Sequence, residues 1–396
     1  MRHLWAVIGF FGVLISFIPV AESSLTTDKE IVRVRLLTEK SQITLTGQGL
    51  HFQAFDKKYQ PVAIPRSSVA QIRVIYKDGK KMWSVRLDNK DPEQIYSDNY
   101  LLVRGDNLRA GSKALPKKLL LNSSGPQKID VVGVIPLDEY VMGVIASEMP
   151  LSWPMESLKA QAVAARSYAL AVMKERMQNP WHLESSVLDQ VFRHVLAEDE
   201  NDQMIQKAVL AVRATQGVKL LSPKNGKILK AFYHADCGGR TSLAKDVWQS
   251  GVNTGTAVDS SCPITPTAQW TLRLTAKELI ARMGVELSGL KLIRPTAVDR
   301  VSKVLLTLND VDAKTLNANE FRQKIGFQDL KSTQFDVKKE GDSFVFKGRG
   351  FGHGVGLCQW GSRTLGQKGL DYKDILRHYY PLAQIQGPVL AASLQK

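Results

Sequence analysis

Beyond residue 20 the sequence contains no apolar run long enough to cross a membrane, for which about 20 consecutive apolar residues are needed. It also contains no internal repeat and no low-complexity tract. These absences exclude a protein with several helical membrane spans and a repeat architecture. The rest of the chain is long enough to bury a large core, in one elaborate domain or in two smaller ones.

The one long apolar run covers residues 4–20 and includes two glycines and a proline. Arg2 precedes it, and Ala21 and Ser23 form a small-x-small cleavage site after it. This layout predicts a secretory signal peptide over residues 1–23, and an uncleaved anchor is the alternative. We expect an exported protein, periplasmic or associated with the cell wall, that has at most a single N-terminal membrane tether.

Positive charge is in excess, with a formal net charge of +15. We expect no nucleic acid as partner, because the exported chain carries no recognised nucleic-acid-binding motif. Cell-wall polymers and anionic lipid headgroups are available outside the cytoplasm, and a positive field speeds encounter with them. The charge also fits simple solubility, so it favours a cell-wall partner without identifying one.

Cysteine is scarce, and the chain has only Cys237, Cys262 and Cys358. In exported proteins a pair of cysteines usually forms a disulfide. Cys237 and Cys262 flank one segment, so we predict a disulfide between them and expect Cys358 to be a small buried residue. Metal binding is the alternative, because His234 and Cys237 have ligand spacing and Cys262 would supply a third group.

The order of the elements predicts an α+β fold. Residues 24–125 contain short β-type runs separated by Gly, Asn and Asp turns, which predict a mostly antiparallel N-terminal β-rich region. Residues 126–385 begin with one more strand at 126–135 and then mix helices with hairpins, one around Asn225-Gly226 and one within 335–350. A tail follows at 386–396. Helices are predicted at about 153–177, 200–215, 276–284, 314–325 and 361–380.

One acid, Glu148, stands in a mostly apolar segment just before the predicted helix at 153–177. Burial would raise the pKa of its carboxyl, and a carboxylic acid that stays protonated near neutral pH can donate a proton to a leaving group. The alternative is a surface acid near a helix start. Lys159 and Arg166 lie seven residues apart on one helix face, either as a solvated stripe or as cations that face a ligand.

A glycine-rich block covers residues 348–362, in which every second residue from Gly348 to Gly356 is glycine. Glycine allows sharp bends and close approach of a ligand. No Lys-Ser/Thr pair follows, so a phosphate loop is not expected, whereas a tight structural turn remains an alternative. The side chains there that can contact sugar hydroxyl or acetamido groups are those of His353 and Gln359. Tyr233 and His234 are similar candidates.

Four blocks together resemble the stage II sporulation protein D (SpoIID) family. They are PLDEYVMGVIASEMPLSWPMESLKAQAVAARSYAL at 136–170, LDQVF at 188–192, LKAFYHADCGGRT at 229–241 with DVW at 246–248, and GRGFGHGVGLCQWGS at 348–362 with DILRHYYP at 374–381. The opening residues 31–49 are similar to the strand pair that often begins these proteins. The resemblance covers roughly residues 30–385, and it implies a SpoIID-like mixed fold with a catalytic domain at 126–385.

The family includes peptidoglycan lytic transglycosylases and amidase enhancers, so the resemblance implies peptidoglycan glycan strands as the partner. It implies that Glu148 is the catalytic acid, cleaving the MurNAc–GlcNAc bond without water to leave 1,6-anhydro-MurNAc ends. Substrate-binding residues would be Lys159, Arg166, Gln190, Tyr233, His234, His353 and Gln359. Asp138 and Glu139 offer a second carboxylate, although we expect them to start a turn.

Two other functions stay open: a non-catalytic peptidoglycan-binding protein that assists a cell-wall amidase, and a muramidase-type hydrolase. Some relatives hold zinc with a His and two Cys near the segment equivalent to 182–192. This sequence has His182 and His194 there but no cysteine. We therefore predict no metal and no cofactor.

Overall fold

The computed structural model describes residues 30–387 except 56–60, 64–66, 78, 89–91, 96–99, 196–201, 249–254, 256–258, 260–261, 263–267, 295–298 and 310. The predicted signal peptide and nearly all of the predicted tail lie outside the described residues. Helices and a large, mostly antiparallel sheet are both present, which confirms the α+β class. Within the described part of the chain, no helix is long and apolar enough to cross a membrane.

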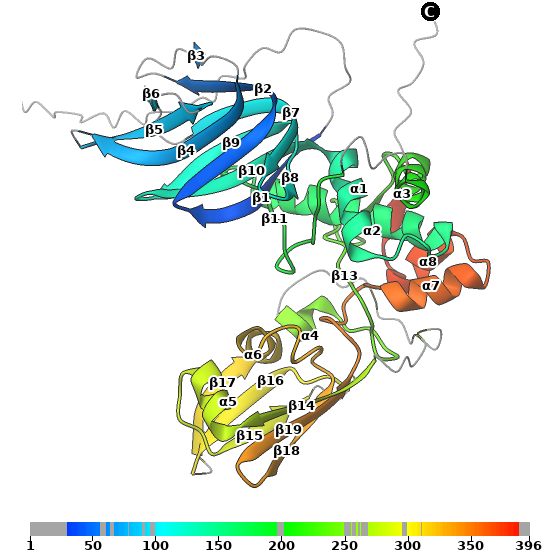
Figure 1. Cartoon of the computed structure of the whole chain (residues 1–396). Coiled ribbons are helices and arrows are strands. Elements are labelled where there is room, and N and C mark those ends of the chain that lie inside the picture. The colour runs from blue at the N-terminus through cyan, green and yellow to red at the C-terminus, as the bar shows by residue number, and fades with distance from the viewer. Residues whose placement is uncertain are drawn as a thin grey trace, which may run out of the picture.

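The N-terminal half forms an 11-stranded sheet, which is drawn in blue and cyan in Figure 1. Apolar side chains of its first strand alternate between buried and less buried positions, as expected for a strand with one face on a core. The strands are β1 (Ile31–Lys40), β2 (Gln42–Phe55), β3 (Pro61–Ala63), β4 (Ser67–Lys77), β5 (Lys80–Leu87), β6 (Glu93–Ile95), β7 (Tyr100–Ala110), β8 (Lys113–Ala114), β9 (Lys118–Gly125), β10 (Lys128–Pro136) and β11 (Leu183–Glu184).

The main strand order is β11-β1-β10-β9-β7-β2-β4-β5-β6, with β3 beside β2 and β8 beside β7. All pairs are antiparallel except β1 with β11. The predicted division at residue 125 falls at the turn between β9 and β10, yet both strands belong to this one sheet. The N-terminal β region is therefore continuous with the segment that carries the SpoIID-like motifs.

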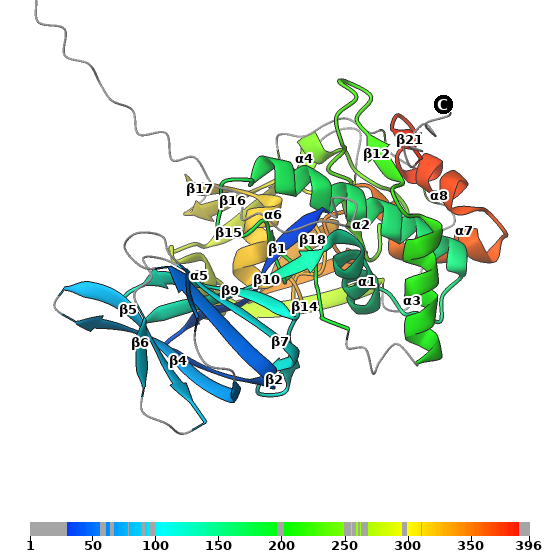
Figure 2. The same cartoon turned by 90° about the horizontal axis from the view of Figure 1, so that it is seen from above.

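A group of helices packs at one end of the sheet (Figures 1 and 2). The first three share the hydrophobic core of the sheet, and the last two pack against the long helix in a second core. The long helix has an alanine-rich surface that is buried over most of its length, so neighbouring helices can approach closely. The elements here are α1 (Leu137–Glu148), α2 (Met155–Glu175), α3 (Gln203–Ala214), β12 (Lys219–Leu221), β13 (Tyr233–His234), α4 (Ala244–Trp248), β20 (Leu357–Cys358), α7 (Gln359–Gln367), α8 (Tyr372–Tyr379) and β21 (Gln384–Gln386).

The third part is a lobe with its own hydrophobic core, drawn in yellow to orange below the helices in Figure 1. Two three-stranded antiparallel sheets and two helices build it. Its elements are β14 (Gln269–Thr275), α5 (Ala276–Met283), β15 (Gly289–Ile293), β16 (Lys303–Leu308), β17 (Val311–Asn317), α6 (Ala318–Ile325), β18 (Phe335–Glu340) and β19 (Ser343–Arg349). The predicted hairpin within 335–350 is the β18–β19 pair.

Three local predictions need correction. Residues 137–148 form α1, which we did not predict, because its Pro136 start and its short apolar run look like a strand followed by a turn. Residues 314–317 belong to β17 rather than to α6. The predicted helix at 361–380 is interrupted between α7 and α8, where Gly369 has a φ of 85°.

Candidate active site

Glu148 is the last residue of α1, so it ends one helix and precedes the next by a short loop. Its side chain is half-buried, and its Oε1 accepts a hydrogen bond from the Val191 N–H at 2.8 Å. Burial raises the pKa of the carboxyl above its ordinary value, while the Val191 N–H and the Gln359 side chain act in the opposite direction. The site therefore favours the protonated acid more than water does.

Glu148 lines a cavity of about 500 Å³. One part of its wall is aromatic: Phe232 stacks on Trp248 with ring centroids 4.4 Å apart, and His353 lies 5.0 Å from Trp248. A pocket with aromatic walls and a few placed polar groups is typical of an organic ligand site. The cavity is bordered by α1, β13, α4 and the glycine-rich block, and residues of α6 and the loop after it also reach it.

Two predicted binding residues, Tyr233 and Gln359, line the cavity beside Glu148, and a third, Gln190, is buried behind Tyr233. The Gln190 side chain accepts a hydrogen bond from Tyr140 Oη at 2.8 Å and donates one to Tyr233 Oη at 3.0 Å. This holds the Tyr233 phenol in place at the cavity wall. Gln359 is buried, and its side-chain nitrogen has no hydrogen-bond partner among the described residues. The Gln359 side chain nevertheless acts on the Glu148 carboxyl and favours its charged form.

The two predicted histidines also reach the cavity, from the parallel pair of β13 and β20 and the loop before it. His234 Nδ1 lies 3.1 Å from the Val355 carbonyl oxygen, and its ring is 5.5 Å from that of His353. Burial, helped by two nearby arginines, lowers the pKa of His353 to about 3, so it is neutral at physiological pH. Gly352 has a φ of 110° and passes so close to His234 that a side chain there would collide with it.

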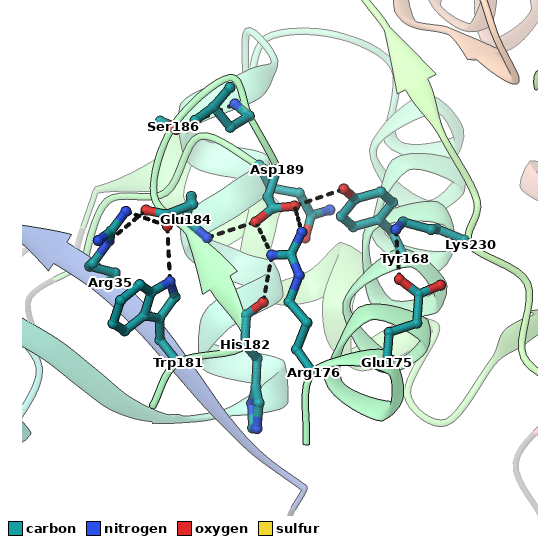
Figure 3. Close-up of polar contacts among 12 residues, drawn as sticks. Arg35, Tyr168, Glu175, Arg176, Trp181, His182, Glu184, Ser186, Asp189 and Lys230 are labelled. Carbon is teal, nitrogen blue, oxygen red and sulfur yellow. Dashed lines mark hydrogen bonds and ion pairs between the residues drawn. The ribbon is translucent and has the colours of Figure 1, made fainter. Parts of the chain in front are cut away.

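Asp189 organises the other end of the site (Figure 3). Its carboxylate oxygens lie 2.6 and 3.1 Å from the two Arg176 guanidinium nitrogens, and they accept hydrogen bonds from Tyr168 Oη at 3.0 Å and from the Glu184 N–H at 2.9 Å. Only 2% of the Asp189 side chain is exposed. The second carboxylate of the cavity is thus fully occupied by structural partners.

The structure places Lys159 and Arg166 away from this cavity, contrary to our expectation that they face the ligand. Arg166 is 2% exposed and donates hydrogen bonds to the Thr215 carbonyl at the end of α3 and to Asp138. Lys159 pairs with Glu156 at 2.6 Å, and Glu156 also accepts from the Tyr372 N–H. Arg166 thus joins α2 to α1 and to the end of α3, whereas Lys159 pairs within α2.

The structure does not show the predicted Cys237–Cys262 disulfide: all three cysteines are free and buried. Cys262 and Cys358 are not bonded to each other either, because their Sγ atoms lie 3.6 Å apart, much more than the bonded distance of about 2.05 Å. Cys237 Sγ lies 3.4 Å from an oxygen of Asp259. Sequence spacing could not reveal that Cys358, nearly a hundred residues away, shares this position. Cys358 itself is buried as predicted.

The segment in which some SpoIID proteins hold zinc does not fit such a site here. Its His182 is buried, and its Nδ1 accepts a hydrogen bond from the Arg33 N–H at 3.2 Å. The stretch 182–192 contains no cysteine. The residues of this stretch thus lack the thiolate ligands of that site.

Comparison with known proteins agrees with this geometry. A family model described as stage II sporulation protein matches residues 126–221. The stage II sporulation protein D of Bacillus subtilis is 31% identical over 293 residues, which cover 71% of this chain and 81% of that protein. The chain belongs to the SpoIID family.

Two further proteins are similar in sequence to this chain. An uncharacterised protein of Brachyspira hyodysenteriae is 28% identical over 89% of this chain and 92% of its own length. The amidase enhancer of Bacillus subtilis is 28% identical, with 60% of this chain and 39% of that protein covered.

Several side chains of this SpoIID site escaped the sequence analysis. Asp189 stands beside Gln190 in a motif that we singled out, and Phe232 and Trp248 also lie within quoted blocks. Their aromatic or acidic side chains are of the kind found in ligand sites, but nothing in the sequence showed that they face Glu148. Arg322, on α6 of the separate lobe, had no signal at all.

Proposed function

We propose that this protein is a peptidoglycan lytic transglycosylase in which Glu148 serves as both acid and base. The observation that carries the proposal is a half-buried carboxyl with a raised pKa on the wall of an aromatic-lined cavity. The membership in the SpoIID family supports a role connected with the cell wall.

The proposed reaction uses one proton twice. Protonated Glu148 gives its proton to the oxygen that links N-acetylmuramic acid to N-acetylglucosamine, and the bond from that oxygen to C1 of the muramic residue breaks. The glutamate carboxylate then takes the proton of the C6 hydroxyl of the same muramic residue, whose oxygen bonds to C1. The products carry a 1,6-anhydro ring, and no water is consumed.

The number of available carboxylates favours this route over hydrolysis. Hydrolytic glycosidases generally use two carboxyl groups about 5–10 Å apart. Among the described residues that line the cavity, Asp189 is the other acid, and its oxygens already bind Arg176, Tyr168 and a backbone N–H. Asp138 and Glu139 lie in the first turn of α1, whereas Glu148 is its last residue. At a rise of about 1.5 Å per residue they are about 15 Å from Glu148 along the helix axis.

We assign the binding of the glycan to Tyr233, His234, His353 and Gln359, with Gln190 as the residue that positions Tyr233. The amide of Gln359, which lies at the cavity and acts on the Glu148 carboxyl, would donate to a sugar oxygen near the reacting bond. Neutral His353 and the Trp248–Phe232 pair would face the apolar side of a sugar ring. The net charge of +15 would attract anionic wall polymers, and export would bring the protein to them.

Product analysis tests the proposal. Purified protein is incubated with glycan strands from which the stem peptides have been removed, and the products are identified by mass spectrometry. The proposal predicts anhydro-muramic ends, each lighter by one water than a reducing end. Reducing ends would instead indicate a muramidase.

A second function is favoured by the similarity to a protein named amidase enhancer. In that case the cavity would bind glycan without cleaving it, and the protein would assist a cell-wall amidase. Glycan binding with no products, together with a higher rate of an added amidase, would support this alternative.

A further inference from the structure

Three thiols and a carboxylate from distant parts of the chain meet in the interior. The ligand atoms of Cys237, Asp259, Cys262 and Cys358 all lie within 4.8 Å of one another, and all four residues are buried. Cys237 follows β13, Cys358 ends β20, and Asp259 and Cys262 belong to the loop between α4 and β14. We propose that these four residues form a tetrahedral site for a thiophilic divalent cation, with zinc as the best fit.

The distances match such a site before any ion is placed. With metal–sulfur bonds of about 2.3 Å, a tetrahedron has edges of about 3.8 Å. Cys262 Sγ and Cys358 Sγ are 3.6 Å apart, and Cys237 Sγ is 3.4 Å from Asp259 Oδ2. Three thiolates with one carboxylate select zinc over hard cations such as magnesium or calcium, which prefer oxygen ligands.

The surroundings are built to hold anionic sulfur. The N–H groups of Cys237 and Gly361 donate to Cys358 Sγ at 3.3 and 3.4 Å. A buried guanidinium, that of Arg300, donates to the Cys237 carbonyl and interacts electrostatically with Cys237 and Cys358. Three thiolates, one carboxylate and a divalent cation leave two negative charges, which Arg300 partly offsets.

The presence of Asp259 distinguishes this cluster from an ordinary apolar core. It is completely buried, and its Oδ2 accepts a hydrogen bond from Tyr379 Oη at 2.7 Å. Its Oδ1 has no hydrogen-bond partner among the described residues, and the ionisable group facing it is His378, whose Nε2 lies 3.8 Å away. Gly361 approaches Asp259 so closely that a side chain there would collide with it. Buried cysteines alone often pack as small apolar residues. A buried carboxylate among them is costly unless its charge is compensated, and a cation compensates it.

A disulfide is the competing use of these thiols in an exported protein. It would join two sulfurs, and it would leave the third thiol unused and Asp259 with only His378, 3.8 Å away, as a possible charge partner. The metal satisfies all four groups at once. A metal at these four residues would run against our expectation of a metal-free protein, and the residues lie outside the segment 182–192.

The site would fix the geometry beside Glu148 without touching substrate. Cys358 caps the start of α7, and the next residue is Gln359 at the cavity. His234 pairs with Cys358 in the β13–β20 register. A metal that ties Cys358 to Cys237, Asp259 and Cys262 would hold both cavity residues in place. The metal site does not depend on the proposed reaction.

The first test measures metal directly. The full chain is purified without a metal-binding tag and without chelator, and its zinc content and zinc-edge X-ray absorption are measured. We expect equimolar zinc with three sulfur ligands at about 2.3 Å and one lighter ligand. Reduced, chelator-treated protein titrated with cobalt(II) should develop the thiolate-to-cobalt charge-transfer band.

Variants assign the ligands. Asp259→Asn and Cys358→Ser should weaken cobalt binding by at least about 10²-fold, whereas Asp130→Asn, which changes an equally buried aspartate in the large sheet, should leave it unchanged. If a variant fails to fold, the wild-type metal content and absorption still decide. Two outcomes overturn the proposal: wild-type protein that binds neither zinc nor cobalt, or native protein whose intact mass reveals a disulfide among the three cysteines.

Discussion

Replacing Glu148 by glutamine tests the proposed acid with little change in structure. The amide keeps the length and shape of the side chain, and its oxygen can still accept the hydrogen bond from Val191 N–H. It cannot give or take a proton. A buried ionisable group is also removed, so we expect the free energy of unfolding at neutral pH to change by no more than about 1 kcal/mol.

The expected kinetic loss is large. General acid–base catalysis contributes about 10²–10⁴ in rate, which is about 2.7–5.4 kcal/mol of activation free energy. Because Glu148 would perform both proton transfers, we expect the upper end of this range. Glycan affinity should change little, since the aromatic wall, Tyr233 and Gln359 remain.

The assay measures turnover on peptide-free glycan, glycan affinity and melting temperature for the same preparations. Glu139→Gln is the matched control, because it makes the same change at the exposed opposite end of α1 and should leave turnover unchanged. Folded Glu148→Gln protein with wild-type turnover would refute the assignment and leave the binding function as the better explanation.

Three further predictions follow from the same contacts. Because burial raises the pKa of Glu148, the contribution of this carboxyl to stability is present below the ordinary glutamate pKa and is lost as pH rises through the raised value. Activity should fall over the same rise in pH. The melting temperature of Glu148→Gln should lack this pH-dependent decrease. Asp189→Asn should cost about 1–3 kcal/mol in urea unfolding, since it removes the charge of a buried carboxylate that pairs with half-buried Arg176, and an unchanged midpoint would contradict this. Arg166→Met should cost about 1–3 kcal/mol without changing glycan affinity; weaker binding at unchanged stability would restore the ligand-facing role.

Periodicity and turn residues predicted much of the fold. The alternation in β1 and the apolar face of α2 each come from one element that packs on one core, so the local pattern carries the information. The local pattern did not predict α1. Nothing within residues 137–148 shows that α2 and α3 cover it. The independent core at 269–349 was also missed, since separate cores depend on which elements meet.

The site was predictable only where motif and chemistry coincide. Glu148, Tyr233, His234, His353 and Gln359 do line one cavity, as the family resemblance implied. The predicted ligand-facing position of Arg166 was not found, because the sequence could not show that a backbone carbonyl at the end of α3 lies within hydrogen-bonding distance of its guanidinium. The arrangement of the three cysteines could not be predicted for a related reason: it depends on distances between segments that the order of residues in the chain does not specify.

The most direct test of the account is cleavage in water labelled with heavy oxygen. A reaction in which the C6 hydroxyl closes on C1 transfers no oxygen from water, so the new ends should carry anhydro rings and no label. Labelled reducing ends would show that water attacks C1 and would contradict the account. No cleavage by folded wild-type protein that binds the glycan would contradict it as well.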